Sequence, residues 1–421
     1  MKLASLIVLL ITVPVPATAL NLTQMQEMAL ANRAVVKEFA TEIDKSRQDV
    51  RIARSPFYPT VDLSYNAYAL DDDSETERRE NSAFLGLINW NLFDGFADTA
   101  ALDAARQRQD IEDLRMQALV QDIQLAVALR YLDVYNQRAQ TEVAEDTLTT
   151  LTSLYEDSEN RFEVGLVDKN TVLRFRVDAA NARLALQARQ ADLRKAINLL
   201  SRTIGATISL AELDFNDFSG EPAITGKSDY ESRMLASRSE IKALEKLGTI
   251  AELSIKEARG AYYPELDVAA GYRTYSDAYL NGVGEFTNEE LRAELIITYN
   301  LFSGFSNEAE LAKAKIEVRT VNYQLIELQD DLTTELRNLF VDYEVSLANV
   351  AVAREDIGAA EENLRITELK YKEGLQSQLD LLDAVSNLSR AQSNYVAVIR
   401  TVFANYYRIT RMVEDFPHDR S

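Results

Sequence analysis

The stretch Asn91-Leu92-Phe93-Asp94-Gly95-Phe96 decides the fold, because the chain contains it twice. The second copy is Asn300-Leu301-Phe302-Ser303-Gly304-Phe305, which lies 209 residues further on, counted from 91 to 300. Each copy follows two short runs of alternating polar and apolar residues and precedes a long segment of helical composition. The sequence therefore predicts a duplicated unit of two β-strands and a long helical hairpin.

Composition excludes several classes of function. The chain of 421 residues carries 45 basic and 67 acidic side chains, a formal net charge of −22 that disfavours binding to nucleic acid. It has no Cys and a single His, His418, so zinc sites and His-dependent catalytic triads lack their residues. With no cofactor-binding loop or nucleophile–base pair visible, we expect no cofactor, no metal and no enzymatic activity.

Residues 1–19 have the pattern of an export signal. A positive N-terminus precedes the apolar run 3–13, and Ala17-Thr18-Ala19 forms a small-residue cleavage site. The run is too short to span a bilayer permanently. We expect the mature chain to begin at residue 20, outside the cytoplasm.

Helical patterns account for most of the mature chain. A first helix is predicted over 22–53, and the segment 97–158 contains neither Pro nor Gly, which would give a helix about 93 Å long. The predicted hairpins turn at Gly165 and Gly374, which suit a left-handed helix C-cap. Domain boundaries follow: a first repeat at 20–204, a connector at 205–232, a second repeat at 233–412 and a tail at 413–421.

Four strands are predicted, at about 60–70, 82–93, 265–276 and 290–302. Each has one apolar face, although Leu85 and Leu87 fall on the polar face of the second strand. Alternation over about ten residues with aromatic ends is typical of a transmembrane β-strand, and a sheet packed on one face in a soluble protein is the alternative. The residues expected at the membrane interface are Tyr65, Trp90, Tyr272 and Tyr299. Because a barrel needs at least about eight strands, four per chain predict a dimer or a trimer.

The return helices of the hairpins begin with different residues. Asp380 and Asp383 follow Gly374 and lie three residues apart, on one helical face, so a symmetric ring would repeat them as two acidic girdles able to attract cations. Ser377 and Asp380 also have the spacing of a helix capping box, which is a purely structural alternative. Thr171 occupies the position of Asp380 in the first copy.

Taken together, the duplicated segments resemble the TolC family of outer-membrane efflux and type I secretion channels. The resemblance rests on Ala-Arg-x-x-aromatic-Tyr-Pro at 53–59 and 258–264, on the two Leu-Phe-x-Gly-Phe motifs, and on Tyr371-x-x-Gly374 followed by Leu-Asp-Leu-Leu-Asp-Ala at 379–384. It implies a mainly α fold with a transmembrane β-barrel: a homotrimer with 12 strands in the outer membrane of a Gram-negative bacterium, a periplasmic α-helical barrel, and the connector in an equatorial belt.

The same resemblance implies partners and sites. The partners are a periplasmic adaptor (membrane fusion) protein, an inner-membrane transporter and outer-membrane lipid. Asp380 and Asp383 match the acidic rings of the periplasmic entrance, and Tyr371 matches a tyrosine that helps hold the tip shut. Gln376 stands where the family has an Arg, and Thr171 where it has an Asp, so a charged latch is not expected here. The alternative function is a periplasmic or secreted coiled-coil scaffold or adaptor without a pore.

Overall fold

The computed structural model describes residues 20–73, 79–224, 226–280 and 287–416. The predicted signal peptide, residues 417–421 of the predicted tail, and His418 with them lie outside these ranges. The chain divides into two compact units. The sheet unit comprises Lys37–Ala118 and Leu235–Thr333, and the hairpin unit comprises the described parts of Met1–Val36, Leu119–Met234 and Thr334–Ser421.

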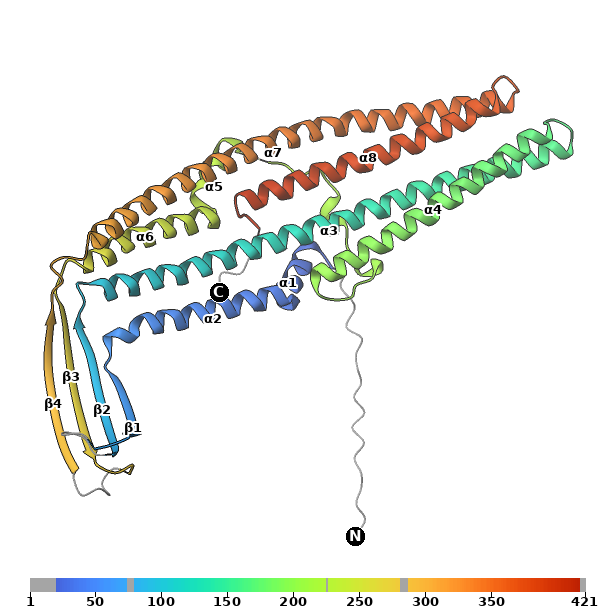
Figure 1. The fold of residues 1–421 in the computed structure, drawn as a ribbon. Coiled ribbons are helices and arrows are strands. Elements are labelled where there is room, and N and C mark those ends of the chain that lie inside the picture. Colours follow the sequence, from blue (N-terminus) through green and yellow to red (C-terminus); the bar gives the residue numbers. More distant parts are fainter. Residues whose placement is uncertain (1–19, 74–78, 225, 281–286, 417–421) are drawn as a thin grey trace, which may run out of the picture. The chain divides into compact units, whose positions relative to one another are not determined.

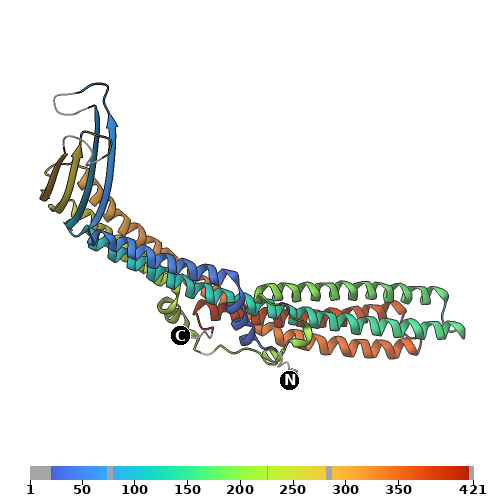
Figure 2. The ribbon, with the colours of Figure 1, turned by 90° about the horizontal axis from the view of Figure 1, so that it is seen from below.

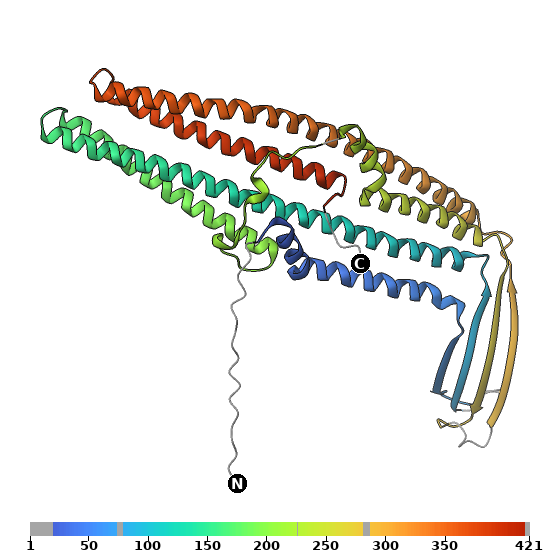
Figure 3. The same ribbon diagram turned by 180° about the vertical axis from the view of Figure 1, so that it is seen from behind.

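The sheet unit contains one antiparallel sheet whose strands follow the order of the chain (Figures 1 and 3). The strands are β1 (Thr60–Ala69), β2 (Glu80–Phe93), β3 (Glu265–Ser276) and β4 (Thr287–Thr298). The register sets Leu63 opposite Gly86, Gly86 opposite Tyr272, and Tyr272 opposite Leu291. Paired residues share a face, so the predicted apolar positions of all four strands line one face of the sheet. The alternation in the sequence predicted this facing.

Two details of the sheet differ from the prediction. A bulge pairs Asn91 with Asp267 but Phe93 with Leu266, so Phe93 rather than Leu92 continues the apolar face. β4 ends at Thr298 rather than near 302, because Thr298 pairs with Glu265 and the residue before Glu265 is a proline, which has no N–H for the ladder.

The repeated Leu-Phe-x-Gly-Phe motif forms the turn between a strand and a long helix. Gly95 and Phe96 both have φ of +71°, and Gly304 and Phe305 have φ of +65° and +69°. A Cβ on Gly95 would lie 2.4 Å from the backbone oxygen of Gly260, so this position needs glycine for space as well as for φ. A left-handed Phe is uncommon and costs about 1–3 kcal/mol. Both copies nevertheless keep it.

The long helices are duplicated in length as well as in order. α3 (Ala97–Glu163) and α7 (Ser306–Lys372) have 67 residues each, and the return helices are α4 (Lys169–Ile204) and α8 (Gln378–Met412). α3 extends beyond the predicted 158, since no Gly or Pro interrupts it before Gly165. No helix among the described residues is long and apolar enough to cross a membrane.

The predicted first helix is two helices. α1 (Leu22–Asn32) ends at Arg33, whose backbone is extended, and α2 (Ala34–Arg54) begins directly after it. The end of α1 packs against the C-cap of α4, because a Cβ on Gly205 would lie 3.0 Å from that of Asn32. This close contact stops α1 at a point that helical periodicity alone does not mark.

The segment predicted as a connector is folded and packed. η2 (Leu210–Glu212) and η3 (Asn216–Phe218) lie within it, and Phe218 packs on Tyr131 with ring centroids 4.9 Å apart. Leu20 forms a parallel bridge with Leu213. The predicted boundary at 232–233 falls inside α5 (Lys227–Ser237), which begins directly after Gly226, the last glycine of the segment.

Each unit has its own apolar contacts. In the sheet unit, the start of α3 packs on α6 (Ser239–Gly260) through Ala104, Ile111, Ile250 and Leu253. In the hairpin unit, Leu151 of α3, Ala182 of α4 and Val385 of α8 form one buried cluster. These contacts hold the two hairpins side by side, and Figure 2 shows their turns at the same end.

Candidate functional site at the hairpin tips

The two tips turn with the same backbone geometry. Gly165 and Gly374 have φ of +75° and +74°. The N–H of Leu166 donates to the oxygen of Arg161 at 2.9 Å, and the N–H of Leu375 donates to that of Lys370 at 2.8 Å. A Cβ at either glycine would meet nothing within 4 Å, so the left-handed conformation rather than crowding requires glycine.

The return helices are capped by different groups. In the first copy the Asp168 carboxylate accepts from the N–H of Thr171 at 2.7 Å. In the second, Ser377 and Asp380 form a capping box: the N–H of Asp380 donates to the Ser377 hydroxyl at 3.2 Å, and the N–H of Ser377 donates to the Asp380 carboxylate at 3.0 Å. The structural role predicted as the alternative for Asp380 is therefore present.

Capping leaves the charge of Asp380 in place. The hydroxyl and N–H of Ser377 hold the pKa of Asp380 below its usual range, and the Gln376 side chain acts in the same direction. Asp380 and Asp383 are both exposed, at adjacent positions on one face of the first turns of α8. An ionised carboxylate at a helix N-terminus can cap the helix and also present charge to solvent. The capping role and the proposed girdle are compatible.

Tyr371 joins the two hairpins. It lies at the end of α7, and its ring meets Phe175 of α4 edge-on with centroids 6.2 Å apart. The guanidinium of Arg161, on α3, lies 5.6 Å from the Tyr371 ring centroid. The Tyr371 hydroxyl is buried and has no hydrogen-bond partner among the described residues, and burial raises its pKa. Phe175 is completely buried, which makes it the anchor of this contact.

A second contact joins the tips through a polar group. The amide nitrogen of the Gln378 side chain donates to the backbone oxygen of Thr171 at 3.0 Å. Thr171 and Gln378 are half-buried, and neither brings a charge to the contact. Gln376, also half-buried and uncharged, is not part of this hydrogen bond. Sequence reasoning missed Arg161, Phe175 and Gln378, because each is an ordinary helix residue whose partner comes from another helix.

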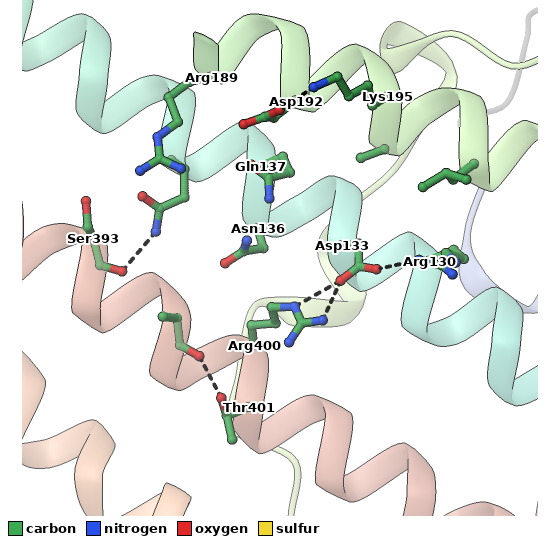
Figure 4. A pocket seen from close by; sticks show the side chains of 14 residues that line it. Arg130, Asp133, Asn136, Gln137, Arg189, Asp192, Lys195, Ser393, Arg400 and Thr401 are labelled. Atoms are coloured by element: carbon green, nitrogen blue, oxygen red, sulfur yellow. Dashed lines mark hydrogen bonds and ion pairs between the residues drawn. The ribbon is translucent and has the colours of Figure 1, made fainter. Parts of the chain in front are cut away.

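Away from the tips, the hairpin unit contains a polar groove. Its lining residues come from α3, α4 and α8, and α3 lies between the other two helices (Figure 4). It has a volume of about 650 Å³. Arg400 of α8 donates to Asp133 of α3 from two nitrogens, at 2.9 and 2.6 Å. The side-chain oxygens of Asn136 and Gln137 are buried there and accept no hydrogen bond from any described residue. In most proteins such buried atoms are satisfied by ordered water or by another protein group.

The four aromatic residues predicted at the membrane interface occupy two levels of the sheet. Trp90 and Tyr299 lie at the end of the sheet where the helices begin. Tyr65 pairs with Phe84 and lies in the middle of β1, and Tyr272, opposite Gly86, lies within β3. Tyr65 lies roughly 16 Å from the start of its strand at 3.3 Å per residue. The position at a membrane interface stays a prediction for all four residues.

Comparison with known proteins matches the whole duplicated arrangement. The family model described as "Outer membrane efflux protein" matches residues 26–206 and again 232–412. Among curated relatives, the chain is similar to the outer membrane efflux protein BepC of Brucella suis, 23% identical over 394 residues that cover 92% of this chain and 84% of that protein. It is also similar to the outer membrane protein TolC of Escherichia coli, 22% identical over 390 residues (88% and 78%).

Solved structures share the fold. The outer membrane protein VceC of Vibrio cholerae has a TM-score of 0.77 at 19% identity, covering 93% of this chain and 96% of that one. The open-state MtrE outer membrane channel of Neisseria gonorrhoeae has a TM-score of 0.75 at 19% identity, with coverage of 93% and 88%. The predicted fold class is confirmed.

Proposed function

Since the chain belongs to the outer membrane efflux protein family, we propose that it forms the outer-membrane exit duct of a tripartite efflux pump or of a type I secretion system. The observation that carries this proposal is the double match of the family model, one for each copy of the strand-pair and hairpin unit. The family is one of transport proteins of the Gram-negative outer membrane that extend into the periplasm. The alternative of a scaffold or adaptor without a pore receives no support from it.

The sheet supports closure of a barrel by several chains. Within the described ranges, β1 and β4 each pair with one strand only, so both edges carry unpaired backbone groups. In a bilayer every such group must be bonded, which a closed ring alone achieves. We propose that three chains pair β4 of one with β1 of the next, giving 12 strands with the apolar face toward lipid.

Exposed apolar rows on two helices of the hairpin unit support a ring of several chains. Val177 and Leu184 of α4 are seven residues apart and 58% and 65% exposed. Val345 and Val352 of α7 are also seven apart and 55% and 65% exposed. Apolar residues at this period form coiled-coil seams. We assign these rows to contact between α4 of one chain and α7 of its neighbour.

The tip contacts support a passive gate with two states. In the described conformation, Tyr371 on Phe175 and Gln378 on Thr171 hold the two hairpins of one chain together. A partner that binds the separated hairpins more tightly shifts the equilibrium toward an open entrance. Asp380 and Asp383, repeated around the ring, then attract cations to that entrance.

An adaptor protein is the proposed partner at the polar groove, with an inner-membrane transporter beyond it. An adaptor helix lying in the groove would meet the charged and amide side chains that line it. In this proposal the adaptor and the inner-membrane transporter, rather than the duct, select most of the transported substrate.

Two measurements test the proposal. Light scattering of the detergent-extracted outer-membrane fraction, with the detergent contribution subtracted, should give a protein mass near three chains. Planar-bilayer recordings of the same fraction should show channel conductance. A monomer in the soluble periplasmic fraction would overturn the duct and favour a helical scaffold.

A further inference from the structure

Two leucines of β2 lie on the face of the sheet that is otherwise mostly polar. The register places Leu85 beside Arg273 and Leu87 beside Gly271, both on β3. In the proposed duct this face lines the lumen of the barrel, where side chains are normally polar. The lipid-facing side of the sheet does not include the two leucines, so membrane insertion gives them no role.

A hollow with a volume of about 240 Å³ opens over these leucines. A Cβ on Gly271 would lie 3.3 Å from Cδ1 of Leu87 and 4.0 Å from Cδ1 of Leu85. Both leucine side chains therefore lean toward the glycine of the neighbouring strand, and with Ala269 they form an apolar floor. Charged side chains of β3 and β4 form the rim of the hollow.

Two arginines and two glutamates make up this rim. Arg292 and Glu294 pair with each other on β4. Arg273 is exposed and forms no ion pair with any residue in the described ranges. It lies directly beside Leu85, whereas Glu290 lies beyond Arg273 on β4. A molecule that covers the leucines therefore meets the guanidinium of Arg273 before it meets the carboxylate of Glu290.

We propose that this hollow binds amphipathic organic anions, such as aromatic carboxylates, on their way through the duct. The apolar part covers Leu85 and Leu87, and the carboxylate pairs with Arg273. This inference rests on the proposed function, because it requires that the polar face line the lumen. It gives the duct a preference of its own among the molecules that its partners deliver.

The chemistry of Arg273 suits this class of ligand. A guanidinium presents two parallel N–H donors to a carboxylate, and it can also lie over an aromatic ring. The hollow is smaller than the roughly 300–1,000 Å³ of pockets that enclose a drug-sized ligand, so it takes one ring system and leaves the rest of a larger molecule in the lumen. Binding should be weak, because a conducting pore has to release what it binds.

The other charge beside the leucines orients the ligand. Asp62 of β1 lies opposite Leu87, on the side away from β3. It does not line the hollow, which opens toward β3 and β4. Repulsion from Asp62 therefore directs a carboxylate toward Arg273 and keeps the apolar part over the leucines.

Block of the channel current measures this binding. The trimer is reconstituted in a planar bilayer, and the blocking concentration of 2-naphthoate is compared with those of two other ions. Acetate has the carboxylate but no ring, and 2-naphthylmethylammonium has the ring but the opposite charge. We expect 2-naphthoate to block at a concentration at least about fivefold lower than either of them.

Two substitutions test the two contacts separately. Arg273→Gln should raise the blocking concentration of 2-naphthoate about fivefold, because the ion pair is lost. Leu87→Thr, which introduces a residue common in strands, should raise it about threefold through the loss of apolar contact. Arg79→Gln is the matched control: it removes the same charge just before β2, roughly 20 Å along the strand from Leu85, and should leave the block unchanged.

The outcomes separate this inference from the duct. A channel that conducts but is blocked as readily by acetate or by the cation as by 2-naphthoate overturns the anion site while the duct stands. Equal effects of Arg273→Gln and Arg79→Gln overturn the role of Arg273. The comparison of the three ions uses the unchanged protein, so it decides the ligand class even where a variant fails to insert. Absence of any conductance overturns the duct and the site with it.

Discussion

The two helical hairpins share a turn but differ in the side chains beyond it. Gly165 and Gly374 adopt the same φ within 1°, in open surroundings, and the helices that precede them are equally long. Beyond the turns, the position of Asp380 is held by Thr171 in the first copy. Duplication has kept the backbone, which builds the hairpin, and has let the side-chain chemistry at the tips diverge.

The aromatic contact shows the same asymmetry. The counterpart of Tyr371 in the first copy is Phe162, and the counterpart of Phe175 in the second is Ala384. The pair Tyr371–Phe175 is thus made once per chain, between α7 and α4. A ring built of such chains has two kinds of helix-pair contact, and only one of them carries the aromatic lock. In the proposed ring, the contact without the aromatic pair would open first.

The largest effect should follow the loss of Phe175. Phe175→Ala removes a fully buried ring and should destabilise the tip by about 3–5 kcal/mol. Amide hydrogen exchange at the start of α4 measures that loss, and channel conductance should rise as the hairpins separate. Phe162→Ala, at the exposed position of the first copy, should change tip stability by no more than about 0.5 kcal/mol. Equal losses of tip stability in the two variants would contradict the asymmetry between the two copies.

Substitution of the turn glycines should affect both copies alike. Gly165→Ala and Gly374→Ala each force a left-handed alanine, at a cost of about 1–2 kcal/mol. Because no neighbouring atom crowds either position, the two losses in tip stability should agree within the error of the exchange measurement. A clear difference would show that the two turns are not equivalent in the assembled protein.

The caps should make both tips sensitive to acid. The N–H of Thr171 lowers the pKa of Asp168, and the hydroxyl and N–H of Ser377 lower that of Asp380. Each carboxylate has a lower pKa in the folded than in the unfolded chain, so its ionised form stabilises the tip. This stabilisation is complete above the unfolded pKa of about 3.9 and is lost as pH falls through the folded pKa. Exchange protection of both turns should therefore be constant between pH 7 and 5 and drop below about pH 4.

Neutral caps provide the control for that pH dependence. Asp168→Asn should abolish the acid response of the first tip only, and Asp380→Asn that of the second only, because each carboxylate acts on its own helix start. A response that persists in both variants would assign the acid sensitivity to other carboxylates.

Local and repeated features were predictable from the sequence, whereas contacts between helices were not. Alternation predicted the shared apolar face, and the glycines predicted the tip turns, because each depends on neighbours in sequence. The break at Arg33 and the packing of Phe175 against Tyr371 depend on segments far along the chain. The level of Tyr65 along its strand likewise follows from the pairing of β1 with β2, which residue type alone does not reveal.

The smallest effect should come from the acidic pair Asp380 and Asp383, which the first copy lacks. Asp380→Asn with Asp383→Asn should lower the cation-over-anion permeability ratio of the open channel by about twofold, measured as a zero-current potential in a salt gradient. The converse variant, Thr171→Asp with Arg174→Asp, gives the first copy the acidic pair of the second and should raise the ratio. If only the second-copy change alters selectivity, the first tip lies away from the ion path. If neither does, Asp380 is a helix cap alone, and the divergence between the copies concerns packing rather than ions.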